Sequence, residues 1–373
     1  MSLVTRSEIQ LPLQFGDSEP FDLWARSNRE VLTTAPESQL AASLLPAMYN
    51  GEDLVLEEPL DAKFADNLST IQDIYSTWWS EAERITVETP SGHSNYAPKT
   101  ERTAAFFTGG VDSFYTLLKH KEEIDALIYV HGFDVDLDDT SLRRRVTEML
   151  QEVGTRFDKE VIEVKTNLRD FSDDRVGWPR YHGAALAFAG LVLQPCFDRL
   201  LIASGAPYDE LRPFGSHPLL DPNWSTSTLQ FIHDGCEASR LEKCQVVGES
   251  DIARQMLLNS AYNCGRCEKC IRTMVQLLAA DALKQCSAFE HELDVEILLE
   301  NEGVRARIRN KDFHYHQPVQ VLRKTGRAPE VVEAIEDALS GPSLRVRARS
   351  KVRDLYGYGR RFAGRLSRRF GFR

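Results

Sequence analysis

One short stretch of the 373-residue chain combines residue types that can hold a phosphate. It follows the apolar segment 103–107 and consists of Thr108, Gly109, Gly110, Val111, Asp112 and Ser113. Adjacent glycines let the backbone approach an anion closely and adopt angles that other residues avoid. A helix beginning here directs its free N–H groups and positive dipole end to the same point. The stretch therefore predicts a phosphate-binding loop between a strand and a helix.

Two side chains of this stretch could add to the chemistry. The Ser113 hydroxyl can donate one more hydrogen bond to an anion. The Asp112 carboxylate needs a partner beside a phosphate, and we consider Mg²⁺, the helix N–H groups, or a role as helix cap. A ligand-free turn is the alternative. No Gly-Lys-Ser/Thr follows, as a Walker loop requires, and the third glycine of a dinucleotide fingerprint is missing.

A second group with chemical potential is a run of three cysteines, Cys264, Cys267 and Cys270. This spacing places thiolates on converging sides of a turn, as tetrahedral Zn²⁺ requires at about 2.3 Å. The chain has seven cysteines, an odd number, and none precedes Cys196. Such clustering in a long cytosolic chain favours a metal site over a disulfide framework. A redox or sulfur-carrying role and inert thiols are the alternatives.

Alternating strand and helix patterns from residue 103 onward must position these groups. Short apolar strands are expected at 103–107, 126–131, 161–164 and 200–203, with helices between them. This order predicts a parallel sheet covered on both faces. Because sites in such sheets lie beyond the carboxyl ends of the strands, the loops 108–113, 132–139 and 204–217 should open on one side.

Length and composition predict three parts. Residues 1–100 are expected to form a smaller mixed α+β accessory domain, with strands at 9–15 and 53–57 and a helix at 61–79. A supporting or lid role is the simpler interpretation, and substrate selection the alternative. Residues 101–290 are expected to hold the α/β domain with the cysteine cluster. Residues 291–373 are expected to form a helical C-terminal region.

Net charge is −11, but a strongly basic tail begins near residue 343. Residues 345–373 alternate apolar and arginine side chains at helical spacing, which predicts a basic amphipathic helix. It could dock on the acidic body, contact a membrane surface, or bind RNA or a partner. No apolar run approaches the roughly 20 residues of a membrane span. With no secretory signal pattern at the start, a cytoplasmic enzyme is expected.

Two motifs bear a resemblance to a known family. Thr108–Ser113 resembles the SGGxDS signature of the PP-loop ATP pyrophosphatases, with Thr108 in place of the first serine. Residues 264–272 are similar to the CGxCxxCxxR stretch of 7-cyano-7-deazaguanine synthases, which bind a structural zinc. The resemblance spans roughly residues 103–285. It implies a doubly wound parallel sheet of the HUP-like type, ATP with its pyrophosphate on the loop, and transfer of AMP to a carbonyl or carboxylate oxygen.

The zinc site departs from that family in one position. Its fourth cysteine lies about eight residues before the other three, where this chain has Met256. Met is a poor zinc ligand. Cys236, Cys244 or Cys286 could replace it, or the site could lack a fourth cysteine.

The resemblance also implies roles for single residues. His131, Ser204 and Gly205 are expected beside the nucleotide, with the loop residues 108–113. Asp112, Ser113 and His217 are the candidate catalytic residues. The polar loops at the carboxyl edge of the sheet supply the substrate-side candidates His182, Asp209, Arg212 and Asp221; a capped surface histidine and simple turns are the alternatives. Asp134 or Asp136 could contact Mg²⁺ or ribose, or form a solvated acidic turn.

The leading hypothesis is an ATP-dependent carbon–nitrogen ligase that needs ATP, Mg²⁺ and Zn²⁺. It adenylates a carboxylate or carbonyl with release of pyrophosphate, and a nitrogen nucleophile then displaces AMP. Ser2 follows Met1, so we expect no N-terminal cysteine glutaminase; nitrogen would come as free ammonia or as an amine, for example from a peptide or protein. A tRNA-modifying sulfurtransferase and a non-catalytic nucleotide-binding protein are the alternatives. A homodimer is among the assemblies we consider.

Overall fold

The computed structural model describes most of the chain and divides it into two compact units. The described residues are 5–14, 19–92, 94, 101–258, 263–289 and 293–341. The first unit is Met1–Tyr262 and the second Asn263–Arg373. The domain boundaries expected near residues 100 and 290 therefore both fall inside a unit.

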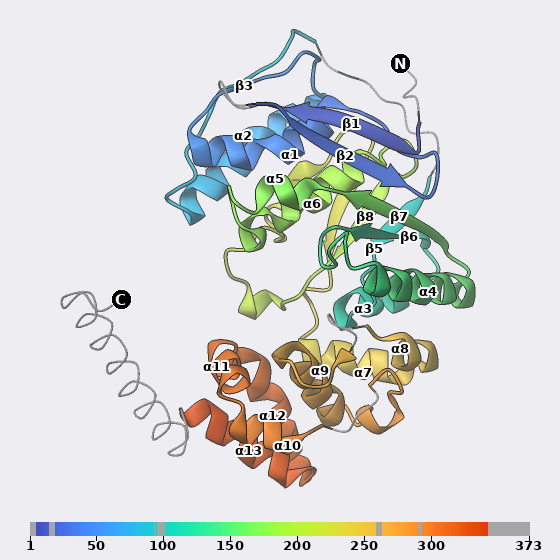
Figure 1. Ribbon diagram of the computed structural model, residues 1–373, viewed down its shortest axis with the longest axis vertical. Coiled ribbons are helices and arrows are strands. Elements are labelled where there is room, and N and C mark those ends of the chain that lie inside the picture. Colours follow the sequence, from blue (N-terminus) through green and yellow to red (C-terminus); the bar gives the residue numbers. More distant parts are fainter. Residues whose placement is uncertain are drawn as a thin grey trace, which may run out of the picture. The chain divides into compact units, whose positions relative to one another are not determined.

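The first unit is built on a seven-stranded sheet of order β1-β2-β7-β6-β5-β8-β9 (Figure 1). The strands are β1 (Glu8–Leu13), β2 (Phe21–Ser27), β5 (Thr103–Phe106), β6 (Ile124–His131), β7 (Glu160–Thr166), β8 (Arg199–Ala203) and β9 (Gln230–Asp234). The strands from β7 to β9 run parallel, whereas β1 and β2 are antiparallel. The expected α/β class with a mostly parallel sheet is confirmed, and the arrangement is compatible with a Rossmann-like fold.

The strand order reverses at β5. The chain goes from β5 to β6 and β7 on one side, and then crosses back to β8 and β9 on the other. Such a reversal opens a crevice beyond the carboxyl ends of the strands, where ligands of open α/β sheets bind. Every residue of β5 is buried, as expected for a central strand covered on both faces.

Helices flank this sheet. They are α1 (Pro36–Asn50), α2 (Ala62–Trp78), α3 (Val111–Lys119), α4 (Thr140–Phe157), α5 (Leu168–Ser172), α6 (Trp178–Leu191), α7 (Arg240–Glu249) and α8 (Asp251–Met256). Helix α1 packs against α6, and α3 packs against α7. Two-residue strands β3 (Leu54–Val55) and β4 (Val87–Glu88) form a separate small sheet.

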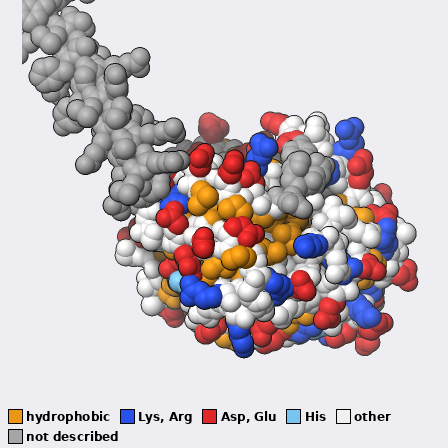
Figure 2. Space-filling view, turned by 90° about the horizontal axis from the view of Figure 1, so that it is seen from below, with side chains coloured by type: hydrophobic (Ala, Val, Ile, Leu, Met, Phe, Trp, Pro, Cys, Tyr) orange, Lys and Arg blue, Asp and Glu red, His pale blue; other side chains and the backbone are white. Residues whose placement is uncertain are grey.

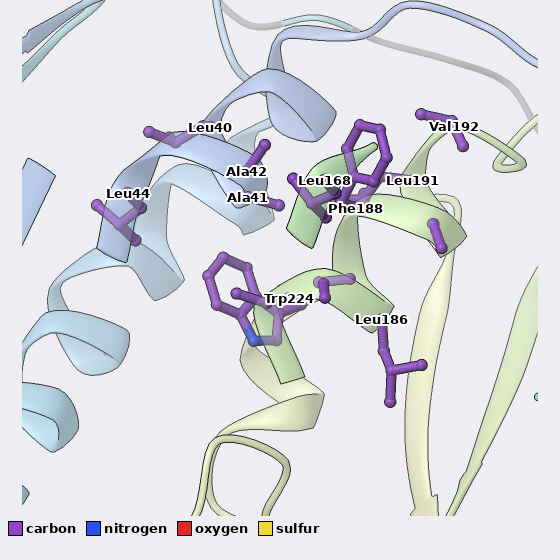
Figure 3. Packing of buried hydrophobic residues seen from close by; sticks show 14 of the residues in the cluster. Leu40, Ala41, Ala42, Leu44, Leu168, Leu186, Phe188, Leu191, Val192 and Trp224 are labelled. Carbon is purple, nitrogen blue, oxygen red and sulfur yellow. The ribbon is translucent and has the colours of Figure 1, made fainter. Parts of the chain in front are cut away.

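The first hundred residues contribute directly to this core. Strand β2 pairs with β7, so the β1–β2 hairpin extends the central sheet. Leu40 and Ala41 of α1 are fully buried with Phe188 of α6 and Trp224 (Figure 3). The expected strand at 9–15 and helix at 61–79 are observed as β1 and α2. The strand expected at 53–57 is only the two-residue β3.

The second unit is helical in the part that the structure describes. Its helices are α9 (Glu268–Ala279), α10 (Val295–Glu300), α11 (Glu302–Asn310), α12 (Phe313–Thr325) and α13 (Pro329–Ser340). Arg305 is fully buried and donates to the carbonyls of Leu298, Asp337 and Gly341, near the ends of α10 and α13. Figure 2 shows a face on which apolar side chains gather between acidic and basic ones.

The basic tail expected at 345–373 lies outside the described residues. Within the described ranges, no helix combines the length and apolar character that crossing a lipid bilayer demands.

Candidate functional site

The glycine loop lies at the carboxyl end of β5, at the reversal of strand order. Gly109 has φ +74°, in the left-handed region. A Cβ on Gly109 would lie 2.7 Å from Met149 Cε, and the Gly109 carbonyl accepts a hydrogen bond from the Leu258 N–H at 2.7 Å. The left-handed backbone angle therefore favours glycine here, and Met149 and Leu258 crowd the position.

Helix α3 begins directly after this loop. Gly110 is its N-cap residue, and no side chain caps the helix. The first N–H groups of a helix have no partner within it, so α3 presents donors and its positive dipole end at the loop. Ser113 donates its hydroxyl to the Gly110 carbonyl at 3.0 Å and accepts from the Thr108 N–H at 3.3 Å. The Ser113 hydroxyl, expected to face an anion, thus closes the loop.

Asp112 is held by basic side chains from α7. Its Oδ2 is 2.6 Å from Arg240 Nη1, and its Oδ1 is 3.7 Å from Lys243 Nζ. Lys243 also donates to the Ser204 carbonyl at 2.7 Å, and its side chain is only 1% exposed. These two basic residues were missed from the sequence; the available signal was a pair of cations three residues apart at the start of a helix that follows a strand.

Lys243 therefore links the loops that follow β5 and β8. Ser204 is buried, and its hydroxyl donates to the Ala206 carbonyl at 2.8 Å. Gly205 is exposed, and a Cβ there would meet nothing within 4 Å. The structure thus places Ser204 and Gly205 beside the strand that carries the glycine loop, because β5 and β8 pair.

His131, expected near the nucleotide, is buried at the end of β6 and contacts Glu163 of the neighbouring strand β7. It is 1% exposed, and its Nε2 is 2.8 Å from Glu163 Oε2. Burial opposes the charge of Glu163, but hydrogen bonds from His131 and Thr147 outweigh it and lower the pKa of that carboxyl. In this arrangement His131 is a sheet residue next to the site.

The substrate-side candidates separate into two sets. Asp209 and Arg212 are exposed in the loop after β8. His182, His217 and Asp221 belong instead to a group that also contains His233 of β9, and we call these four residues the histidine cluster. Asp221 is fully buried and accepts from Ser216 Oγ, the His217 N–H and His233 Nδ1.

His233 was missed from the sequence. It is the penultimate residue of β9, which places it at the carboxyl edge of the parallel sheet. The short His-Asp ending of an apolar strand was the signal that could have found it.

Aromatic rings enclose the other two imidazoles of the histidine cluster. His182 lies edge-on to Trp178 at 5.1 Å, and His217 lies edge-on to Trp78 of α2 at 4.8 Å between ring centroids. Burial, with a further contribution from His233, lowers the pKa of both His182 and His217, although Asp221 opposes the shift. Both rings are consequently neutral, and able to accept a proton, near pH 7.

The three clustered cysteines come together in the second unit. The sulfurs of Cys264, Cys267 and Cys270 all lie within 4.8 Å of one another, so they could hold a metal such as zinc. The Cys267 N–H lies 3.4 Å from Cys264 Sγ. Hydrogen bonds, first from the Cys270 side chain, lower the pKa of Cys267 to about 5. The same hydrogen bond raises the pKa of Cys270. Metal ions bind cysteine as the thiolate.

No fourth ligand joins this group among the residues that the structure describes. Cys236 donates to Ser204 Oγ in the first unit, and Cys244 lies buried on α7. Cys286 is buried in the second unit, apart from the three. The described part of the site therefore supplies three cysteine sulfurs.

Comparisons of the chain with protein-family models, curated proteins and solved structures gave no match.

Proposed function

We propose that the chain is a PP-loop ATP pyrophosphatase-like ligase, related to the 7-cyano-7-deazaguanine synthases. It binds ATP with the pyrophosphate on residues 108–113, transfers AMP to a carboxylate or carbonyl oxygen, and lets a nitrogen nucleophile displace AMP. The observation that carries this proposal is the position of the glycine loop. It lies between a buried central strand and an uncapped helix start, at the reversal of strand order.

Charge at the loop supports an anionic ligand. Two cations, Arg240 and Lys243, lie beside the Asp112 carboxylate. Both cations are nearly buried, at 9% and 1% side-chain exposure, and buried charges are screened little by salt. Fixed N–H groups and cations stabilise charge on departing pyrophosphate without reorganising.

The cysteine cluster takes a structural part in this proposal. Cys264, Cys267 and Cys270 would hold Zn²⁺ and fix the start of α9. Mg²⁺ would enter with ATP as its usual counterion.

The test is nucleotide calorimetry followed by a pyrophosphate-release screen against carboxylates, including 7-carboxy-7-deazaguanine. We expect heat with Mg·ATP, and release that depends on one acid class. Asp112→Asn should cut release by at least about 100-fold, because Arg240 and Lys243 lose the carboxylate that positions them beside the loop. Glu122→Gln is the matched control, since the Glu122 side chain is 87% exposed near the other end of α3.

Two outcomes separate the alternatives. Heat with ATP but no pyrophosphate under any condition would identify a non-catalytic nucleotide-binding protein. Absence of both would overturn the proposal.

A second candidate, a tRNA-modifying sulfurtransferase, is favoured by one observation. The cysteine group in the described residues has three cysteine sulfurs, which would leave one corner of an iron–sulfur cluster open. Brown protein with absorbance near 400 nm after anaerobic purification would support this candidate. Colourless protein with one bound zinc would exclude it.

A further inference from the structure

The histidine cluster has no role in the ATP half of the proposed reaction. It lies at the ends of β8 and β9, whereas the glycine loop follows β5. Since β5, β8 and β9 are consecutive in the sheet, the ends of β5 and β9 are about 10 Å apart, two strand spacings. That separation allows a second reactant to approach a group activated at the loop.

His233 is arranged as a proton acceptor. Its Nδ1 lies 2.6 Å from Asp221 Oδ2. Because a carboxylate only accepts, Nδ1 carries the proton of the neutral ring and Nε2 holds a lone pair. The His233 side chain is 3% exposed, and its Nε2 is buried without a hydrogen-bond partner in the described part of the chain. Buried acceptors of this kind are rare and call for a donor.

A second buried ring nitrogen of the histidine cluster also has an open position. His182 Nδ1 is also buried with no hydrogen-bond partner among the described residues. The charges that act on His182 come from Asp134, Asp221 and His233. The lone pair of His233 Nε2 and the two carboxylates favour a small cation that carries N–H protons.

We propose that the histidine cluster binds ammonium, or the terminal ammonium group of a primary amine, and that His233 Nε2 takes its proton. This inference rests on the proposed ligase function and assigns the source of nitrogen within it. The Asp221 carboxylate stabilises the imidazolium that forms, as the acid of an Asp–His pair does in other enzymes.

The proton and electron count of the step is complete. One N–H proton of ammonium moves to His233 Nε2 and frees the nitrogen lone pair. That pair forms the C–N bond to the adenylated carbonyl carbon, the C–O bond to AMP breaks, and AMP leaves with the bonding electrons. The new amide nitrogen loses one further proton to solvent, and His233 returns its proton to solvent.

The N-terminal region takes part in this site. Trp78 of α2 lies edge-on to His217 of the histidine cluster, and Tyr75 donates to the Arg180 carbonyl at 3.0 Å, at the start of α6. Trp78 therefore places one aromatic ring of the N-terminal region against the histidine cluster, and Tyr75 holds the start of α6, which carries His182.

The test follows the imidazole nitrogens of the full-length protein by ¹⁵N NMR at constant ionic strength. We titrate with ammonium chloride, methylammonium chloride and tetramethylammonium chloride, the last of which has no N–H group. We expect a saturable shift of the His233 Nε2 resonance with ammonium and at least a tenfold smaller shift with tetramethylammonium. A response to methylammonium would extend the site to primary amines.

His233→Gln should remove the response, and His316→Gln, with a side chain 61% exposed in the second unit, should not. Equal shifts with all three cations, or an unchanged response in His233→Gln, would mean a structural water only and overturn the inference. ATP calorimetry on the same sample keeps the two proposals apart. ATP binding without an ammonium response would overturn only the ammonium site. An ammonium response without ATP binding would overturn the proposed ligase reaction.

Discussion

At the scale of single residues, the glycine loop is defined by what surrounds it. Gly109 is held between Met149 and Leu258, and Asp112 is neutralised by Arg240. The motif letters indicated a loop that could accept an anion. They did not indicate which cations balance Asp112, because those cations come from a helix about 130 residues later, which only the fold brings near.

Gly109→Ala tests the packing of the loop. The new Cβ would meet Met149 Cε at 2.7 Å and force a left-handed backbone angle on alanine. We expect a loss of about 2–3 kcal/mol in the free energy of unfolding, measured in urea, and loss of nucleotide heat. Gly177→Ala is the matched control, because Gly177 has φ +77° but open space around it. A double variant with Met149→Ala should recover part of the loss; equal effects at both glycines would contradict the packing argument.

A pH dependence is expected from Glu37 of α1. Burial raises the pKa of this carboxyl, although hydrogen bonds from the Asp61 N–H and Ser94 Oγ oppose the shift. A raised pKa in the folded state means that stability is fully present below the pKa of the unfolded chain and is lost as pH rises through the folded value. Urea unfolding from pH 4 to pH 8 should show this decline.

Glu37→Gln keeps the acceptor oxygen and removes the charge. It should flatten the decline and stabilise the protein at pH 8 relative to the natural chain, with little difference at pH 4. Parallel curves for the two proteins would show that Glu37 is not the group responsible.

At the scale of elements, Arg305 joins the ends of two helices. The last carbonyls of a helix have no partner within it, and Arg305 of α11 satisfies carbonyls near the ends of α10 and α13. Its side chain also pairs with Asp337 at 2.9 Å. Arg305→Met fills similar space but leaves these carbonyls buried.

We expect Arg305→Met to cost about 3–5 kcal/mol, the range for breaking a buried charged network. Urea unfolding of the full chain, followed by hydrogen exchange in residues 302–341, would measure it. Arg307→Met is the control, since Arg307 is exposed on the same helix. Equal destabilisation by the two changes would show that the contacts of Arg305 with the helix-end carbonyls do not stabilise the second unit.

Sequence patterns predicted four of the five parallel strands, because buried strands are short, apolar and bounded by turns, and missed β9. They did not predict that the β1–β2 hairpin joins the central sheet. The alternation in residues 9–15 predicts a half-buried strand but does not name its partner, and β7 is far away in sequence. His233 was missed for the same reason. A single histidine in a strand indicates a functional site only once the fold shows that Asp221 lies beside it.

At the scale of the whole molecule, the two units should respond differently to loss of metal. The cysteine cluster lies entirely in the second unit, within residues 264–270. Chelation, or Cys267→Ser, should increase hydrogen exchange in α9 and lower the thermal stability of the second unit. The central sheet should keep its protection, because its core consists of strands and helices of the first unit.

Cys196→Ser is the control for thiol chemistry, since Cys196 belongs to the first unit and not to the cysteine cluster. Metal analysis should give one zinc per chain before chelation. Uniform loss of protection over both units, or no zinc in freshly purified protein, would contradict the separation.

The pairing of β2 with β7 sets an order of events during synthesis. The Trp24 carbonyl accepts from Thr166 Oγ1 across 142 residues of chain, and the Trp24 N–H donates to the neighbouring Asn167. The hairpin leaves the ribosome first, yet the strand edge that completes it does not exist until β7 has been made. Its apolar face, with Leu11 and Leu23, must wait exposed or be shielded during that interval. A nascent chain halted before residue 160 would therefore expose the unpaired hairpin and its apolar face to chaperones. In a chain extended past residue 200, β7 could pair with β2 and bury that face.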